Sequence, residues 1–79
     1  DTLYLIQTGS FKTPERAERQ KAELALLGLE AEIKDHINSN RQRWYRVTVG
    51  PFDSRSKMAS ARNVIISNGL EASVMKRKL

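Results

Sequence analysis

Four side chains in the sequence offer the aromatic and hydrogen-bonding chemistry that binds polar polymers. Trp44, the only tryptophan, is followed at intervals of two residues by Arg46 and Thr48, and Gln7 lies near the N-terminus. An indole supplies a large apolar surface, a guanidinium supplies five donors and a permanent charge, and an amide both donates and accepts. These groups suit a ligand with apolar, polar and anionic parts, provided that the fold brings them onto one surface.

The residue types needed for catalysis or metal binding are sparse and wrongly spaced. The 79 residues include no cysteine and one histidine, His36, which lies in a polar segment and is interpreted as a solvated side chain. Ser10 lies in Thr-Gly-Ser-Phe, which is not a nucleophile elbow. Glu30 and Glu32 alternate on a predicted strand, as solvated charges would. We therefore expect a domain that is not an enzyme and needs neither a metal nor a cofactor.

The charge balance is basic. Fourteen Lys and Arg residues against nine Asp and Glu residues give a net charge of +5 at pH 7. This favours nucleic acid, a membrane surface or an acidic polymer as partner, but a net charge of about 2–8 is also ordinary for a small soluble domain. No apolar run approaches the ~20 residues of a membrane span. Because the chain begins with Asp1 rather than methionine, we expect residues 1–79 to be a single domain cut from a longer protein.

The elements that must position these side chains form two copies of one unit. At an offset of 41 residues, the tetrapeptide Gly-Leu-Glu-Ala at 28–31 recurs at 69–72. A solenoid needs about three repeats or more, so two copies predict one pseudo-symmetric domain. The other matching pairs are Tyr4 and Tyr45, Ile6 and Val47, Gly9 and Gly50, Phe11 and Phe52, Leu24 and Ile65, and Ile33 and Val74.

Each copy is predicted to form a strand, a helix and a second strand. Residues favouring β-structure mark strands at 3–8, 30–34, 44–49 and 72–76, and the polar segment 35–41 is expected to be a hairpin connection. The resulting β-α-β-β-α-β order is an α+β, ferredoxin-like fold with a four-stranded antiparallel sheet. Right-handed crossovers place both helices on one face, so the other face has no cover.

Capping signals define the two helices. Thr13 as N-cap and Pro14 at the first position begin a helix that runs to about Leu27. The second helix is expected to begin near Asp53 or Ser54 and to end at Gly69. The apolar positions predicted to face the core are Ala17, Leu24 and Leu27 on the first helix and Met58, Ala61 and Ile65 on the second.

Strand alternation assigns side chains to the two faces of the sheet. Because the repeat aligns Tyr4 with Tyr45 and Ile6 with Val47, we expect this face, with Thr8 and Val49, to lie against the helices. A polymer-binding surface is therefore predicted on the open face; the alternative is that its tryptophan only caps the sheet edge or packs under the hairpin loop. The side chains assigned to the open face are Leu5, Gln7, Trp44, Arg46 and Thr48.

Two segments resemble a known family. Leu5-Ile6-Gln7-Thr8-Gly9-Ser10-Phe11 is similar to the opening strand of SPOR domains, and Trp44-Tyr45-Arg46-Val47-Thr48-Val49-Gly50-Pro51-Phe52 to their third strand and following turn. The resemblance covers essentially the whole chain and is greatest to the C-terminal domains of septal cell-division proteins of Gram-negative bacteria. It implies binding residues at Gln7, Ser10, Trp44 and Arg46. Ser10 rests on the resemblance alone, because alternation is not a safe guide beyond Gly9.

The resemblance also implies a ligand and a location. SPOR domains bind peptidoglycan glycan strands that have lost their stem peptides, which amidases produce at the division septum. We therefore expect a monomeric targeting module in the periplasm, in a host protein anchored in the inner membrane, with no nucleic acid partner and no membrane insertion by the domain itself.

Two other functions remain open at this point. RNA-recognition motifs share the strand and helix order and bind single-stranded RNA on the same open face. Their central strand has two or three stacking aromatics, whereas the corresponding strand here offers only Trp44. A sheet edge could instead accept a strand from a protein partner.

Overall fold

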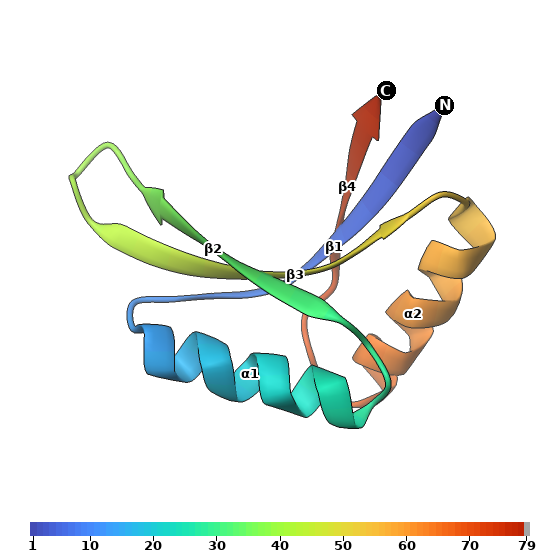
Figure 1. The fold of residues 1–79 in the computed structure, drawn as a ribbon, viewed down its shortest axis with the longest axis horizontal. Coiled ribbons are helices and arrows are strands. Elements are labelled where there is room, and N and C mark those ends of the chain that lie inside the picture. Colours follow the sequence, from blue (N-terminus) through green and yellow to red (C-terminus); the bar gives the residue numbers. More distant parts are fainter. Residues whose placement is uncertain (79) are drawn as a thin grey trace.

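The fold consists of two consecutive strand-helix-strand units whose strands merge into one antiparallel sheet (Figure 1). The computed structural model describes residues 1–78. The sheet order is β2-β3-β1-β4, and β1 and α1 recur as β3 and α2 at the offset of the sequence repeat. The predicted fold class is thereby confirmed. The elements are β1 (Thr2–Phe11), α1 (Pro14–Leu26), β2 (Ala31–Ile37), β3 (Arg43–Phe52), α2 (Arg55–Ser67) and β4 (Ser73–Lys78).

Side-chain caps start both helices where the sequence predicts. The hydroxyl of Thr13 accepts a hydrogen bond from the backbone N–H of Arg16 at 3.4 Å, and that of Ser54 accepts one from the N–H of Lys57 at 3.1 Å. Of the two candidate starts of the second helix, Ser54 is therefore the N-cap. Each cap satisfies one of the N–H groups that a helix leaves without an intrahelical partner.

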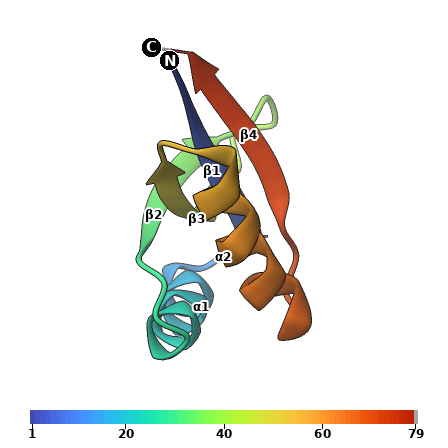
Figure 2. The same cartoon turned by 90° about the vertical axis from the view of Figure 1, so that its right-hand side faces the viewer.

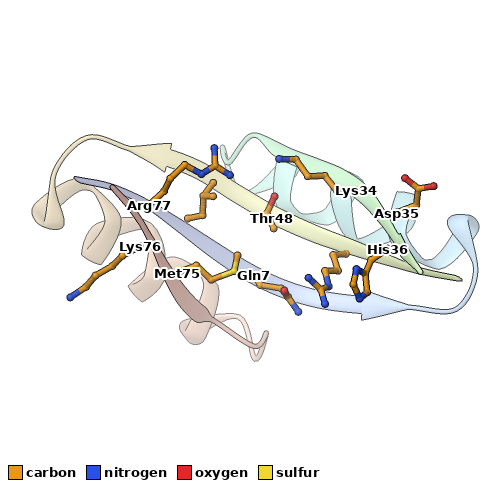
Figure 3. A pocket seen from close by; sticks show the side chains of 10 residues that line it. Gln7, Lys34, Asp35, His36, Thr48, Met75, Lys76 and Arg77 are labelled. Carbon is orange, nitrogen blue, oxygen red and sulfur yellow. The ribbon is translucent and has the colours of Figure 1, made fainter. Parts of the chain in front are cut away.

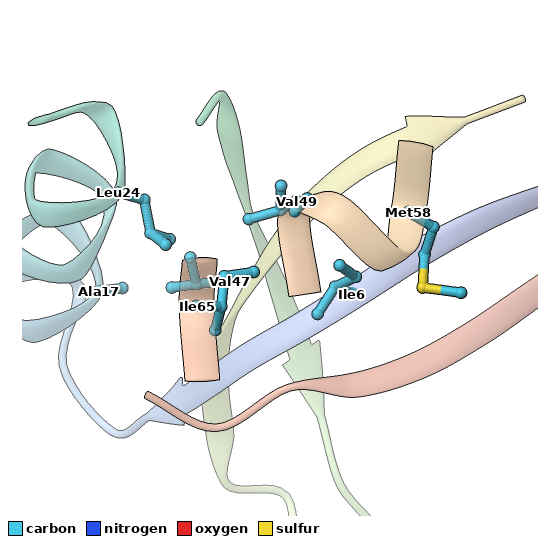
Figure 4. Close-up of a cluster of buried hydrophobic side chains, with 8 residues drawn as sticks. Ile6, Ala17, Leu24, Val47, Val49, Met58 and Ile65 are labelled. Atoms are coloured by element: carbon cyan, nitrogen blue, oxygen red, sulfur yellow. The ribbon is translucent and has the colours of Figure 1, made fainter. Parts of the chain in front are cut away.

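Both helices pack on the same face of the sheet, and the core lies between these two layers (Figure 2). The predicted apolar positions are buried there with one exception. Leu27 is the C-cap of α1 and only half-buried, because the helix ends at Leu26, and Leu29 packs against the core after the turn. The buried apolar side chains, most of them labelled in Figure 4, are Ile6, Ala17, Leu24, Val47, Val49, Met58, Ala61 and Ile65.

One polar pair is buried within this core. The hydroxyl of Thr8 donates a hydrogen bond of 2.8 Å to Oε1 of Gln20, and both residues are buried. This bond joins β1 to α1 directly beside the point at which β1 changes register with β3. A buried amide oxygen without a donor costs about 1–3 kcal/mol.

We expect Thr8→Val to destabilise the domain by about 1–2 kcal/mol, because valine keeps the shape of threonine but leaves the Gln20 oxygen without its donor. For a domain of this size, each kcal/mol lowers Tm by roughly 4–8 °C. Thermal unfolding followed by circular dichroism measures the change. The double variant Thr8→Val/Gln20→Leu, which removes both partners, should recover part of the loss; no recovery would contradict a stabilising role for the pair.

The strands are longer than predicted, and the connection between the repeats is shorter. Asp35, His36 and Ile37 belong to β2 rather than to the hairpin loop, and they pair with the first residues of β3. The turn begins at Asn38, whose side-chain oxygen accepts hydrogen bonds from the N–H groups of Asn40 and Gln42 at 2.9 and 3.0 Å. The prediction of a loop was wrong here because exposed polar residues on an edge strand show no apolar periodicity.

Candidate functional site

The open face of the sheet is shaped by two irregularities in the pairing of β1 with β3. Gln7 pairs with Thr48, but Ser10 pairs with Arg46, so β1 has one extra residue at Thr8–Gly9. Such a bulge shifts the alternation of side chains by one position. Strict alternation would turn Ser10 toward the helices, whereas the bulge brings it onto the open face opposite Arg46.

Glycine is required within this bulge because of close packing. A Cβ atom on Gly9 would lie 2.8 Å from Oε1 of Gln20 and 2.9 Å from the ring of Phe11. The Gln20 side chain cannot move freely away, since its oxygen accepts the hydrogen bond of Thr8. The second irregularity lies at Gly50–Pro51 in β3, where Gly50 has a φ of +119°, a conformation that L side chains rarely adopt.

The six residues predicted for the site all lie on the open face, where they line two adjoining hollows. Leu5, Gln7 and Thr48 line the central hollow, which has a volume of about 380 Å³. Ser10 and Trp44 line the tryptophan hollow of about 340 Å³. The sixth residue, Arg46, lines both. Thr48 is only 7% exposed and therefore lies at the bottom of its hollow.

Trp44 forms one wall of the tryptophan hollow. It is half-buried on β3, directly opposite His36 of β2, and no helix covers it. The ammonium of Lys12 lies 5.4 Å from the centre of its ring, close enough for a cation–π contact. Lys12 does not line the hollow, which Trp44 shares with Ser10 and Arg46.

Several residues of this face were missed by sequence reasoning. His36 was interpreted as a solvated loop residue, but it lies on β2 and lines both hollows. Lys34 pairs with Arg46, and Met75 of β4 pairs with Leu5, so both reach the same face. Lys34 lay within the predicted strand 30–34, where alternation could already have identified it. His36 would have been identified in the same way, had the strand been predicted to extend beyond Lys34.

The open face is predominantly cationic. Arg46, Lys34 and Arg77 line the central hollow together with one carboxylate, Asp35, which pairs with Arg43 at 3.3 Å. Within residues 1–78, no carboxylate forms an ion pair with Arg46 or Arg77. The guanidinium of Arg46 is therefore available to an anionic ligand.

Residues 1–78 contain no cluster of three or more His, Cys, Asp or Glu side chains placed to hold a metal ion. Across the same residues, neither helix has the length and apolar character to cross a membrane.

Comparisons with known proteins agree with this geometry. The family model described as SPOR domain matches residues 1–76. The crystal structure of the RlpA SPOR domain from Pseudomonas aeruginosa superposes with a TM-score of 0.81 at 29% identity, covering 96% of this chain and 99% of that one. The solution structure of the peptidoglycan binding domain of the B. subtilis cell wall lytic enzyme CwlC has the same fold, with a TM-score of 0.78 at 20% identity over 99% of this chain and 92% of that one. No curated protein sequence gives a significant match. The match of the family model over nearly the whole chain means that this protein belongs to the SPOR domain family.

Proposed function

We propose that this domain binds peptidoglycan through the open face of its sheet, and that its preferred ligand is a glycan strand without stem peptides. The observation that supports this most directly is an uncovered face on which Trp44 and Arg46 border the same hollow. Membership of the SPOR family and the peptidoglycan-binding relative from B. subtilis support the same ligand. They also support a binding domain rather than an enzyme.

Each predicted site residue has a role that fits this ligand. The indole of Trp44 stacks on the C–H face of a sugar ring, which is apolar although the ring edge is polar. The guanidinium of Arg46 pairs with the lactyl carboxylate of a muramic acid through charge-assisted hydrogen bonds. Gln7 and Ser10 bond hydroxyl or acetamido groups, and Leu5 and Thr48 form the floor against which the strand lies.

Selectivity for denuded strands follows from the chemistry of the lactyl group. A stem peptide is attached to this group as an amide, so an intact strand has no free carboxylate there for Arg46. The peptide also adds bulk that prevents a strand from lying flat across the sheet, which penalises the wrong ligand sterically. Because the face is open and solvated, the affinity is expected to be on the order of micromolar.

A cell-wall ligand implies that the domain works outside the cytoplasm. Denuded glycan forms where amidases remove stem peptides, and at a division septum this makes the domain a targeting module for its host protein. We propose a monomeric domain in the periplasm, linked to a host that is anchored in the inner membrane.

A pull-down on purified sacculi tests the ligand. Sacculi treated with an amidase should retain the domain strongly, and untreated sacculi should retain little, because only the treated strands have free lactyl carboxylates. Equal retention on both would contradict the preference for denuded glycan, and retention on neither would contradict peptidoglycan binding altogether.

Single-stranded RNA at matched ionic strength is the appropriate competitor in this assay. Apart from Trp44, the aromatic residues of the chain pack against the core rather than on the open face, which leaves a single ring for stacking bases. We therefore expect RNA to compete only weakly; displacement by RNA at low concentration would favour the nucleic acid function instead. The aromatic residues that pack against the core are Tyr4, Phe11, Tyr45 and Phe52.

A further inference from the structure

The central hollow contains cations that the ligand contacts described above do not use. Lys34 comes from β2 and Arg77 from β4, the two edge strands of the sheet. Figure 3 shows their charged ends pointing toward one another above Thr48. Neither residue lines the tryptophan hollow. Within residues 1–78, Arg46 and His36 are the only residues that line both hollows.

Two cations that point toward one another across a hollow can share one anion, and because both are exposed, solvent screens part of the repulsion between them when no anion is bound. Lys34 has one contact with Glu32, at 4.0 Å, and both side chains are more than half exposed, so this pair contributes little. No other ion pair within residues 1–78 involves either cation. An anionic group of a ligand would therefore relieve the repulsion and accept hydrogen bonds from both sides.

The floor of the central hollow indicates which kind of anion fits. Leu5 and Met75 are cross-strand partners on β1 and β4, and Met75 is 36% exposed. Thr48 lines the same hollow and supplies a hydroxyl beside this apolar pair. An apolar floor with donors at its rim suits a carboxylate attached to a sugar ring better than a fully hydrated inorganic ion.

We propose that Lys34 and Arg77 form a second anion subsite, which binds another lactyl carboxylate of the same glycan strand that is bound at Arg46. This inference rests on the proposed function, because the ligand is the same denuded strand. Muramic acid alternates with glucosamine along the strand, so a strand that crosses both hollows presents free carboxylates at regular intervals. The domain thus recognises the number of free carboxylates as well as the absence of peptides.

The test compares two soluble ligands of equal length. One is a denuded tetrasaccharide with two free lactyl carboxylates, and the other is the same tetrasaccharide with one carboxylate capped as a methyl amide. We expect the unmodified domain to bind the two-carboxylate ligand on the order of tenfold more tightly than the capped ligand in calorimetry. This factor corresponds to the contribution of one charge-assisted hydrogen-bonded pair to the binding free energy. The double variant Lys34→Gln/Arg77→Gln should bind both ligands with nearly equal affinity.

Two controls separate this effect from general charge loss. The variant Lys21→Gln/Arg62→Gln removes the same two charge types from exposed positions on the helices, and it should keep the tenfold preference. The variant Lys34→Arg/Arg77→Lys keeps both charges on the open face and should also keep most of the preference.

The outcomes distinguish this inference from the proposed function. If the unmodified domain binds denuded sacculi but does not distinguish the two tetrasaccharides, the second subsite is wrong and glycan binding stands. If the Lys34→Gln/Arg77→Gln variant keeps the tenfold preference, the subsite is likewise wrong. If the unmodified domain binds neither tetrasaccharide nor denuded sacculi, both proposals are wrong.

Discussion

A Trp44→Ala domain is expected to lose its retention on denuded sacculi while remaining folded. The indole is half-buried on the open face and is not part of the buried core, so its removal leaves the packing between sheet and helices intact. Central aromatic contacts in interfaces typically cost about 2 kcal/mol or more on truncation, which corresponds to roughly 30-fold in affinity. A loss of this size moves an affinity on the order of micromolar beyond the range of a pull-down.

The controls for Trp44 use other apolar side chains of the same domain. Leu26 is 89% exposed at the end of α1, and Leu26→Ala should leave retention unchanged. Trp44→Phe should retain part of the binding, because a smaller ring still stacks on a sugar. Undiminished retention of Trp44→Ala would contradict the proposed site. A large drop in its Tm would instead support the alternative that Trp44 only stabilises the β2–β3 hairpin.

The second large effect is expected for Arg46→Gln. Glutamine keeps some hydrogen bonding but removes the charge and the paired donors of the guanidinium, and hydrogen bonds to charged groups contribute about 1.5–3 kcal/mol. We expect affinity for denuded glycan to fall by roughly ten- to a hundredfold. The salt dependence of binding should also become weaker, because one attractive charge pair is lost. Fluorescence titrations at several salt concentrations measure both changes.

Two further variants, Arg43→Gln and Arg46→Lys, test whether the loss of affinity is specific to the guanidinium of Arg46. Arg43 is three residues earlier on β3 and pairs with Asp35, so Arg43→Gln should change affinity by less than about twofold. Arg46→Lys should bind with intermediate affinity, because lysine keeps the charge but not the planar fork. Equal losses for Arg43→Gln and Arg46→Gln would indicate general electrostatic attraction and would contradict a specific carboxylate contact.

The repeat, the helix starts and the buried face could be derived from the sequence because their causes are local. Thr13 and Ser54 cap the helices through contacts with residues three positions away. The alternation of Ile6 with Gln7 and of Val47 with Arg46 depends only on the two-residue period of a strand. On β1 it assigned side chains to the helix-facing and open sides correctly up to Thr8, where the bulge begins. The family resemblance followed from the same two strands.

The tertiary structure alone decided how the open face is completed. Ser10 faces outward because β1 bulges at Gly9, and this bulge depends on β3 as pairing partner and on packing against Gln20, which is distant in sequence. His36 joins the face because β2 continues along β3. Lys34 and Arg77 line one hollow because the outer strands β2 and β4 lie on either side of the central pair. Such pairings join residues far apart in the chain, so they have no signature in local composition or periodicity.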